Sequence, residues 1–178
     1  MWIFLTGDAM SFGALLVAYG AIRAASANWP IPNDILGISL TAFMTFLLIV
    51  SSLTMVRALS AVKHGDISGL KKYLGMTILG GVIFLGLQAY EWTHLIHVGL
   101  GFSENPWGSS LFGATFFSIT GFHGMHVTGG VIYLSVVLIN AQRGKFSADN
   151  HNIVELVGLY WHFVDLVWIL VFTLVYLI

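Results

Sequence analysis

The sequence predicts an all-α, multi-pass membrane protein built as a bundle of five transmembrane helices. The first observation is composition: 57% of the 178 residues are hydrophobic and only 8% are charged, whereas soluble domains carry about 25% charged residues. The second is that five apolar stretches each reach the roughly 20 residues that a spanning helix needs. The length suits one domain, so residues 1–178 are expected to form a single membrane-embedded bundle.

The five predicted spans follow one another with short polar connections. They run from about Met1 to Ile22, Ile35 to Leu59, Tyr73 to His97, Ser109 to Asn140, and Ile153 to Ile178. The fourth is long enough to tilt or to extend past the bilayer. The segment Asn28–Asn33 contains two prolines and is expected to break the helix between the first two spans.

Basic residues predict the orientation of the bundle. Six of the seven Lys and Arg residues fall in or beside the second and fourth connections: Arg57, Lys63, Lys71, Lys72, Arg143 and Lys145. Alternating spans place these connections on one side, together with the N-terminus. The positive-inside rule then predicts a cytoplasmic N-terminus and an outside C-terminus.

Composition also excludes some classes of function. The chain has no cysteine, which excludes disulfides, iron–sulfur clusters and thiolate metal sites. Its net charge of -1 gives no support for nucleic-acid binding.

The last span carries ionisable residues along one side. Glu155, His162 and Asp165 are separated by seven and three residues, spacings that return to nearly the same helix face. An ionisable group at the bilayer centre costs a few kcal/mol unless something polar faces it. This span is therefore expected to face the other helices.

Other spans carry possible partners at comparable depths. Glu91 and His94 lie toward the outer end of the third span, and His123 and His126 lie near the middle of the fourth. We expect His123 or His126 to bond across to the fifth or third span. Asp8 has no basic residue in its own span, so it is expected either to be protonated or to be held by a lipid or a partner subunit.

Three interpretations of these residues stay open on the pattern alone. Glu91 and His94 match half of a di-iron bundle motif, with His162 and Asp165 as a loose second half, but a complete site needs further carboxylates. His123, His126 and His162 are candidate axial ligands of a b-type haem. The third interpretation is a scaffold of paired polar groups that fixes the helices or contacts lipid headgroups.

Four segments, in order along the chain, resemble subunit III of the haem-copper respiratory oxidases. They are M-W-I-F-L-T-G-D from Met1, L-Q-A-Y-E-W from Leu87, F-F-S-I-T-G-F-H-G-M-H-V from Phe116, and G-L-Y-W-H-F-V-D-L-V-W from Gly158. The resemblance covers essentially the whole chain.

The resemblance implies a redox-inactive accessory subunit that binds no haem and no copper itself. Such subunits lie against subunit I, which holds the redox centres and pumps protons, and they bind phospholipid and protect the oxidase during turnover. They are also associated with oxygen access and proton uptake. Bacterial members often have five spans, lacking the first two of the mitochondrial form, and this chain is similar to that form. The implied location is a bacterial inner membrane.

The resemblance also assigns a role to one residue. The family's carbodiimide-reactive intramembrane carboxylate falls on Asp8, a lipid- or proton-related position. Most members of the cytochrome c branch of the family have Ser-Glu where this chain has Gly7-Asp8, so the side chain is shorter here. Glu91, His94, His123, His126, Glu155, His162 and Asp165 are expected to form the buried polar scaffold.

Two alternative functions are also considered. One is a subunit III-like component of a quinol oxidase, a nitric oxide reductase or a respiratory supercomplex. The other, of another class, is a haem-b membrane anchor.

Overall fold

A computed structural model describes residues 1–178, apart from the side chains of Asn33 and Asp34. All the regular elements of the described chain are helices, and five of them are long and apolar enough to cross a membrane. The elements are α1 (Trp2–Ala25), α2 (Pro32–Ile35), α3 (Ile38–Lys63), α4 (Ile67–His97), α5 (Leu111–Gln142), α6 (Asn152–Val171) and the π-helical segment η1 (Phe172–Leu177). The predicted fold class is thus confirmed.

The predicted boundaries differ from the observed ones where capping chemistry was overlooked. The third span begins at Ile67 rather than Tyr73, because the Asp66 carboxylate accepts a hydrogen bond from the Gly69 N–H at 2.8 Å. This contact satisfies one of the amide groups left open at a helix start. Gly65 precedes it with a φ of 77°, a left-handed conformation that glycine adopts without strain. The expected break at residues 28–33 holds up to Ile31, and Pro32 begins the one-turn helix α2.

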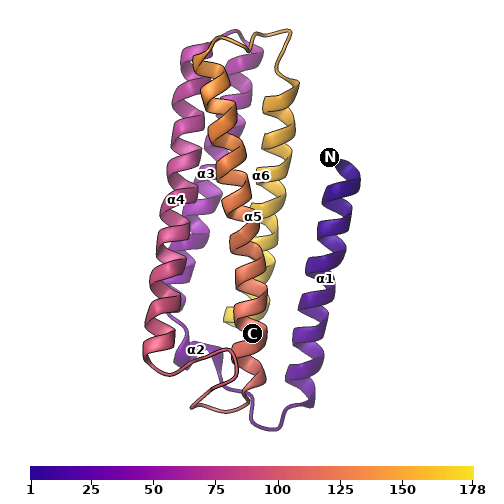
Figure 1. Ribbon diagram of the computed structural model, residues 1–178, viewed down its shortest axis with the longest axis vertical. Coiled ribbons are helices and arrows are strands. Elements are labelled where there is room, and N and C mark those ends of the chain that lie inside the picture. Colours follow the sequence, from indigo (N-terminus) through magenta and orange to yellow (C-terminus); the bar gives the residue numbers. More distant parts are fainter.

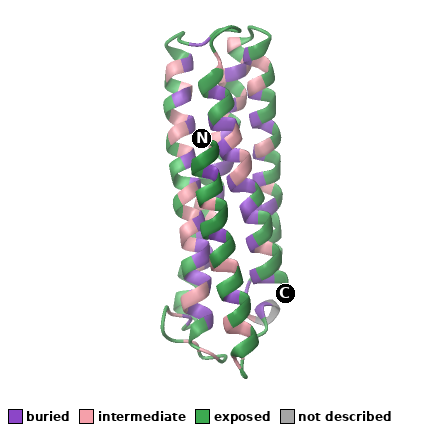
Figure 2. Cartoon of the chain, turned by 90° about the vertical axis from the view of Figure 1, so that its right-hand side faces the viewer, coloured by how far each residue is buried: buried purple, intermediate pink, exposed green. Residues whose placement is uncertain are grey.

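Helices α3, α4, α5 and α6 form a closed bundle, while α1 stands to one side of it (Figure 1). The contact between α3 and α4 is the most extensive, and α1 contacts only α5 and α6 to any extent. Figure 2 shows the outer face of α1 almost wholly exposed. The connections after α3 and after α5 lie at one end of the bundle, and those after α1 and α4 lie at the other (Figure 1).

In the core of the bundle, large aromatic rings pack against glycine residues of neighbouring helices. Trp161 of α6 is 1% exposed and lies against Gly81 of α4 and Gly130 of α5. A Cβ atom on Gly81 would come within 2.7 Å of both the Trp161 ring and the Val131 side chain. Because lipid gives helices little hydrophobic reason to associate, such close approach at small residues is what holds them together.

Candidate functional site: polar contacts between the helices

The carboxylate of α1 faces an imidazole of α5. Asp8 Oδ2 lies 3.4 Å from His126 Nε2, and the two side chains are 14% and 12% exposed. The sequence predicted that His123 or His126 would bond to the third or fifth span, and His126 departs from this prediction. Its ring instead faces the first span, and only its backbone carbonyl meets the fifth, by accepting a hydrogen bond from the Tyr160 hydroxyl at 3.0 Å.

The contact of the second ring nitrogen of His126 determines which nitrogen carries the hydrogen. Nδ1 lies 2.8 Å from the Phe122 carbonyl oxygen. A carbonyl only accepts, so Nδ1 must carry the hydrogen. A neutral ring then presents a lone pair at Nε2 toward Asp8, and an ionised carboxylate facing that lone pair would be repelled. Asp8 Oδ2 and His126 Nε2 accordingly face each other at 3.4 Å without a hydrogen bond between them.

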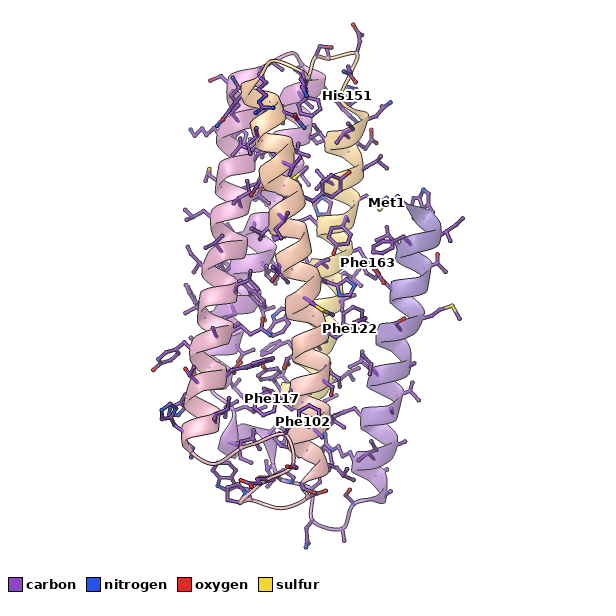
Figure 3. All side chains as sticks on the ribbon, in the orientation of Figure 1. Met1, Phe102, Phe117, Phe122, His151 and Phe163 are labelled. Atoms are coloured by element: carbon purple, nitrogen blue, oxygen red, sulfur yellow. The ribbon has the colours of Figure 1, made fainter. Side chains whose placement is uncertain are left out.

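Aromatic rings enclose this pair on its inner side. The rings of Phe12 and Phe122 lie 5.3 and 4.7 Å from the His126 ring. Phe122 and Phe163 both lie on the side of the bundle that faces α1 (Figure 3). The Asp8–His126 pair is thus largely shielded from the surroundings, and a weakly screened environment strengthens the interaction of charged or polar groups.

Glu91 is the centre of a second, fully buried network. Its side chain is 4% exposed. Oε1 accepts a hydrogen bond from the Thr41 hydroxyl at 3.0 Å, and Oε2 accepts one from the Tyr176 hydroxyl at 3.0 Å. Both carboxylate oxygens are therefore satisfied, and α3, α4 and η1 are tied together at one end of the bundle.

A third polar cluster joins α3 to α6. The His162 Nδ1 lies 2.5 Å from the Ser52 hydroxyl oxygen. Asp165, one turn further along α6, is 8% exposed and lies next to the same hydroxyl. Its Oδ1 makes no hydrogen bond with any described group.

His123 is placed differently from the other candidate residues. It is fully buried, and neither ring nitrogen forms a hydrogen bond within the described part of the chain. The rings of Phe84 and Trp168 lie 5.7 and 4.8 Å away, and Phe12 closes a third side. A haem needs an open slot beside its axial ligand. The aromatic packing around His123 leaves no such slot.

Two of the predicted scaffold residues lie on the surface of this chain. His94 is exposed, and so does not join Glu91 as the half-motif would require. Glu155 is exposed and lies 3.9 Å from Lys63 of α3. Among the residues that the structure describes, no three His, Asp or Glu side chains gather in a way that would hold a metal ion.

The partners that sequence reasoning missed are hydroxyl groups of α3. Thr41 bonds Glu91, Thr45 accepts from the Trp168 indole at 3.0 Å, and Ser51 accepts from the Trp161 indole at 3.1 Å. These serines and threonines recur at helical spacing and line the inner face of α3. The pairs Thr41 and Thr45, four apart, and Ser51 and Thr54, three apart, were a usable signal in the second span.

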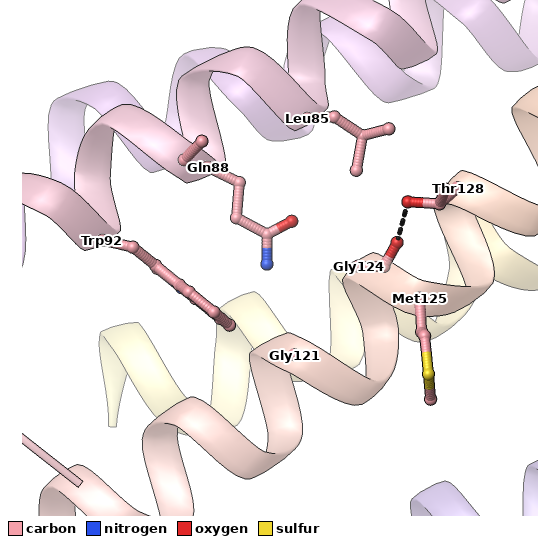
Figure 4. A pocket seen from close by; sticks show the side chains of 8 residues that line it. Leu85, Gln88, Trp92, Gly121, Gly124, Met125 and Thr128 are labelled. Carbon is pink, nitrogen blue, oxygen red and sulfur yellow. Dashed lines mark hydrogen bonds between the residues drawn. The ribbon is translucent and has the colours of Figure 1, made fainter.

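The surface also has a groove between α4 and α5, with a volume of about 300 Å³ (Figure 4). Gly121 and Gly124 form its floor, and Gln88 donates through Nε2 to the Thr120 carbonyl at 2.8 Å. Thr128 satisfies its hydroxyl on the Gly124 carbonyl of its own helix. The groove is therefore mostly apolar.

Fold and site together define a five-span helical membrane protein whose spans are joined by buried polar contacts. A family model described as cytochrome c oxidase subunit III matches residues 1–178. A probable cytochrome c oxidase subunit 3 of Nocardia farcinica is 37% identical over 177 residues, covering 99% of this chain and 85% of that protein. Cytochrome c oxidase subunit 3 of Bacillus subtilis is 37% identical over 179 residues, covering 99% and 83%. The Synechocystis protein of the same name is 40% identical over 179 residues, covering 99% and 73%.

The chain belongs to the cytochrome c oxidase subunit III family. It is an accessory subunit of a terminal oxidase and forms part of an oxidoreductase complex.

Proposed function

We propose that this chain is a redox-inactive subunit that supports oxygen reduction and proton pumping carried out by its partners. The observation that carries the proposal is the family match over the whole of residues 1–178. Haem and copper would then be held by other subunits, and this chain would contribute packing surfaces and polar groups within the bilayer.

The main partner in this proposal is subunit I, with further oxidase subunits and membrane phospholipids beside it. The membrane is the bacterial inner membrane, because the relatives named above are bacterial and five helices suit a bilayer. Basic residues gather at the end of the bundle that holds the connections after α3 and α5. That end, and with it the N-terminus, is proposed to face the cytoplasm.

Asp8 is the proposed lipid- or proton-related carboxylate of this subunit. Its partner His126 lies on α5, so the pair joins the loosely held α1 to the bundle. Glu91, His123, His162 and Asp165 are proposed to act as a scaffold, together with the exposed His94 and Glu155.

The test is an Asp8→Ala variant within the complete oxidase. We expect the complex to assemble and to begin turnover at the normal rate, but to lose activity several-fold sooner during sustained turnover. Asp149→Ala, in an exposed connection, is the matched control because it also removes one carboxylate. A turnover lifetime equal to that of the control would contradict the role of Asp8.

A separate experiment tests the class of protein. The chain would be tagged and purified from membranes, its partners identified by mass spectrometry, and the absorption spectrum of the isolated chain recorded. We expect oxidase subunits to co-purify and the isolated chain to lack a Soret band. A Soret band would favour a haem-b anchor, and subunits of a quinol oxidase or nitric oxide reductase would redefine the complex.

A further inference from the structure

A crevice runs between α1 and α6 on the side of the bundle that α3 adjoins. Its volume is about 380 Å³, and it is lined by Thr6 and Ala9 of α1 and by His162 and Leu166 of α6, among others. Most of its wall is apolar. His162 is the one ionisable side chain among the described residues that line it.

One ring nitrogen of His162 is already used within the chain. Nδ1 bonds the Ser52 hydroxyl, which also adjoins the carboxyl group of Asp165. If Ser52 donates to Asp165, then His162 Nδ1–H donates to Ser52 and Nε2 is left as an acceptor. If Ser52 donates to Nδ1 instead, Nε2–H is left as a donor. In both tautomers Nε2 presents one hydrogen-bonding position.

No described side chain fills that position, since the Ser52 contact is the one hydrogen bond that the described residues make with the His162 ring. The neighbouring Asp165 Oδ1 is a second polar atom without a partner among them, although the residue is more than nine-tenths buried. Asp165 Oδ1 is enclosed, so a partner from outside the chain cannot reach it. His162 lines the crevice, and a polar atom left unbonded in hydrocarbon is costly, so a partner from outside this chain is expected at Nε2.

Depth decides which kind of partner can reach Nε2. His162 lies ten residues after Asn152, the first residue of α6, which is about 15 Å along the helix. That is about half of the 30 Å hydrocarbon thickness. A lipid headgroup stays at the interface, and an acyl chain offers no hydrogen bond. A side chain on another transmembrane helix can both reach the middle of the bilayer and form a hydrogen bond there.

We propose that the α1–α6 crevice seats a transmembrane helix of a neighbouring oxidase subunit, with a hydroxyl or amide side chain of that helix bonded to His162 Nε2. The inference rests on the proposed function, which supplies the neighbouring subunit. The short side chains of Thr6 and Ala9 on the α1 wall allow the close backbone approach that membrane helices use. Ser52 holds the imidazole in place from behind.

The experiment uses the assembled complex with a photoreactive benzophenone amino acid introduced at one position. Leu166 lines the crevice and is 57% exposed, whereas Ile132 on α5 is 60% exposed and lines none of the hollows described above. We expect illumination to link position 166 to another oxidase subunit and to do so several-fold more than position 132. Mass spectrometry would identify the linked molecule.

A substitution at His162 then tests the hydrogen bond itself. His162→Phe should lower the yield of the subunit adduct from position 166, and His162→Gln, which keeps a polar atom, should restore part of it. Adducts with lipid alone would overturn the inference. The proposed function would still stand in that case, provided that oxidase subunits co-purify with the chain. An adduct yield that His162→Phe does not change would equally overturn it. If no oxidase subunit co-purifies, the proposed function itself fails.

Discussion

Helices α3 to α6 are more deeply buried than helix α1 and are held together by contacts of a different kind. In the most apolar stretch of the last span, 50% of the residues are buried, whereas in the most apolar stretch of α1 only 17% are buried. The four-helix bundle is joined by indole, hydroxyl and carboxylate hydrogen bonds, whereas α1 is joined by aromatic contacts and the Asp8–His126 pair. The bundle is therefore expected to hold itself together, and α1 to depend on neighbouring chains.

The largest effect is expected from Trp161→Ala at the centre of the bundle. The change empties the space between Gly81 and Gly130 and removes the indole bond to Ser51. Loss of a large buried aromatic side chain costs about 3–5 kcal/mol. Unfolding of the chain in detergent, followed by circular dichroism during titration with a denaturing detergent, measures the loss. Phe4→Ala on α1, where the ring is 53% exposed, is the control, and an equal loss of stability there would break the comparison.

A smaller effect is expected from removing the buried carboxylate of α4. Glu91→Ala leaves the Tyr176 hydroxyl without its acceptor inside the bundle, whereas the Thr41 hydroxyl can still donate to the Gly37 carbonyl. Each unsatisfied buried group costs about 1–3 kcal/mol. Asp8→Ala removes a carboxylate from the α1 contact and should change the same unfolding curve less. If the order of the two variants were reversed, α1 would be the better-anchored region.

The smallest and most direct test adds a single methyl group to each region. Gly81→Ala places a Cβ against both Trp161 and Val131, and overpacking of this kind costs about 1–3 kcal/mol. At Gly13 of α1 the same methyl group meets nothing within 4 Å. Gly13→Ala should therefore leave stability in detergent nearly unchanged. A clear loss of stability in the Gly13→Ala variant would show that α1 is already enclosed by other helices in the isolated chain.

Much of the fold was predictable because hydropathy and length alone specify membrane spans. All five spans were found, and the error at Tyr73 came from overlooking Asp66 as a cap. The candidate site was harder to predict. Asp8, Glu91 and His126 could be singled out, since ionisable residues in apolar spans are rare. Their partners could not, because one sequence does not show which helices are neighbours.

The π-helical segment η1 has a consequence for how the C-terminal end tolerates change. Its backbone hydrogen bonds join residues five apart rather than four apart as in an α-helix, and Tyr176 bonds Glu91 from within it. Removing one residue there would turn every later side chain by about 100°. Tyr176 would then swing away from the carboxylate although the helix would be almost as long. Insertions and deletions near this end should accordingly be judged by the rotation they cause rather than by the length they change.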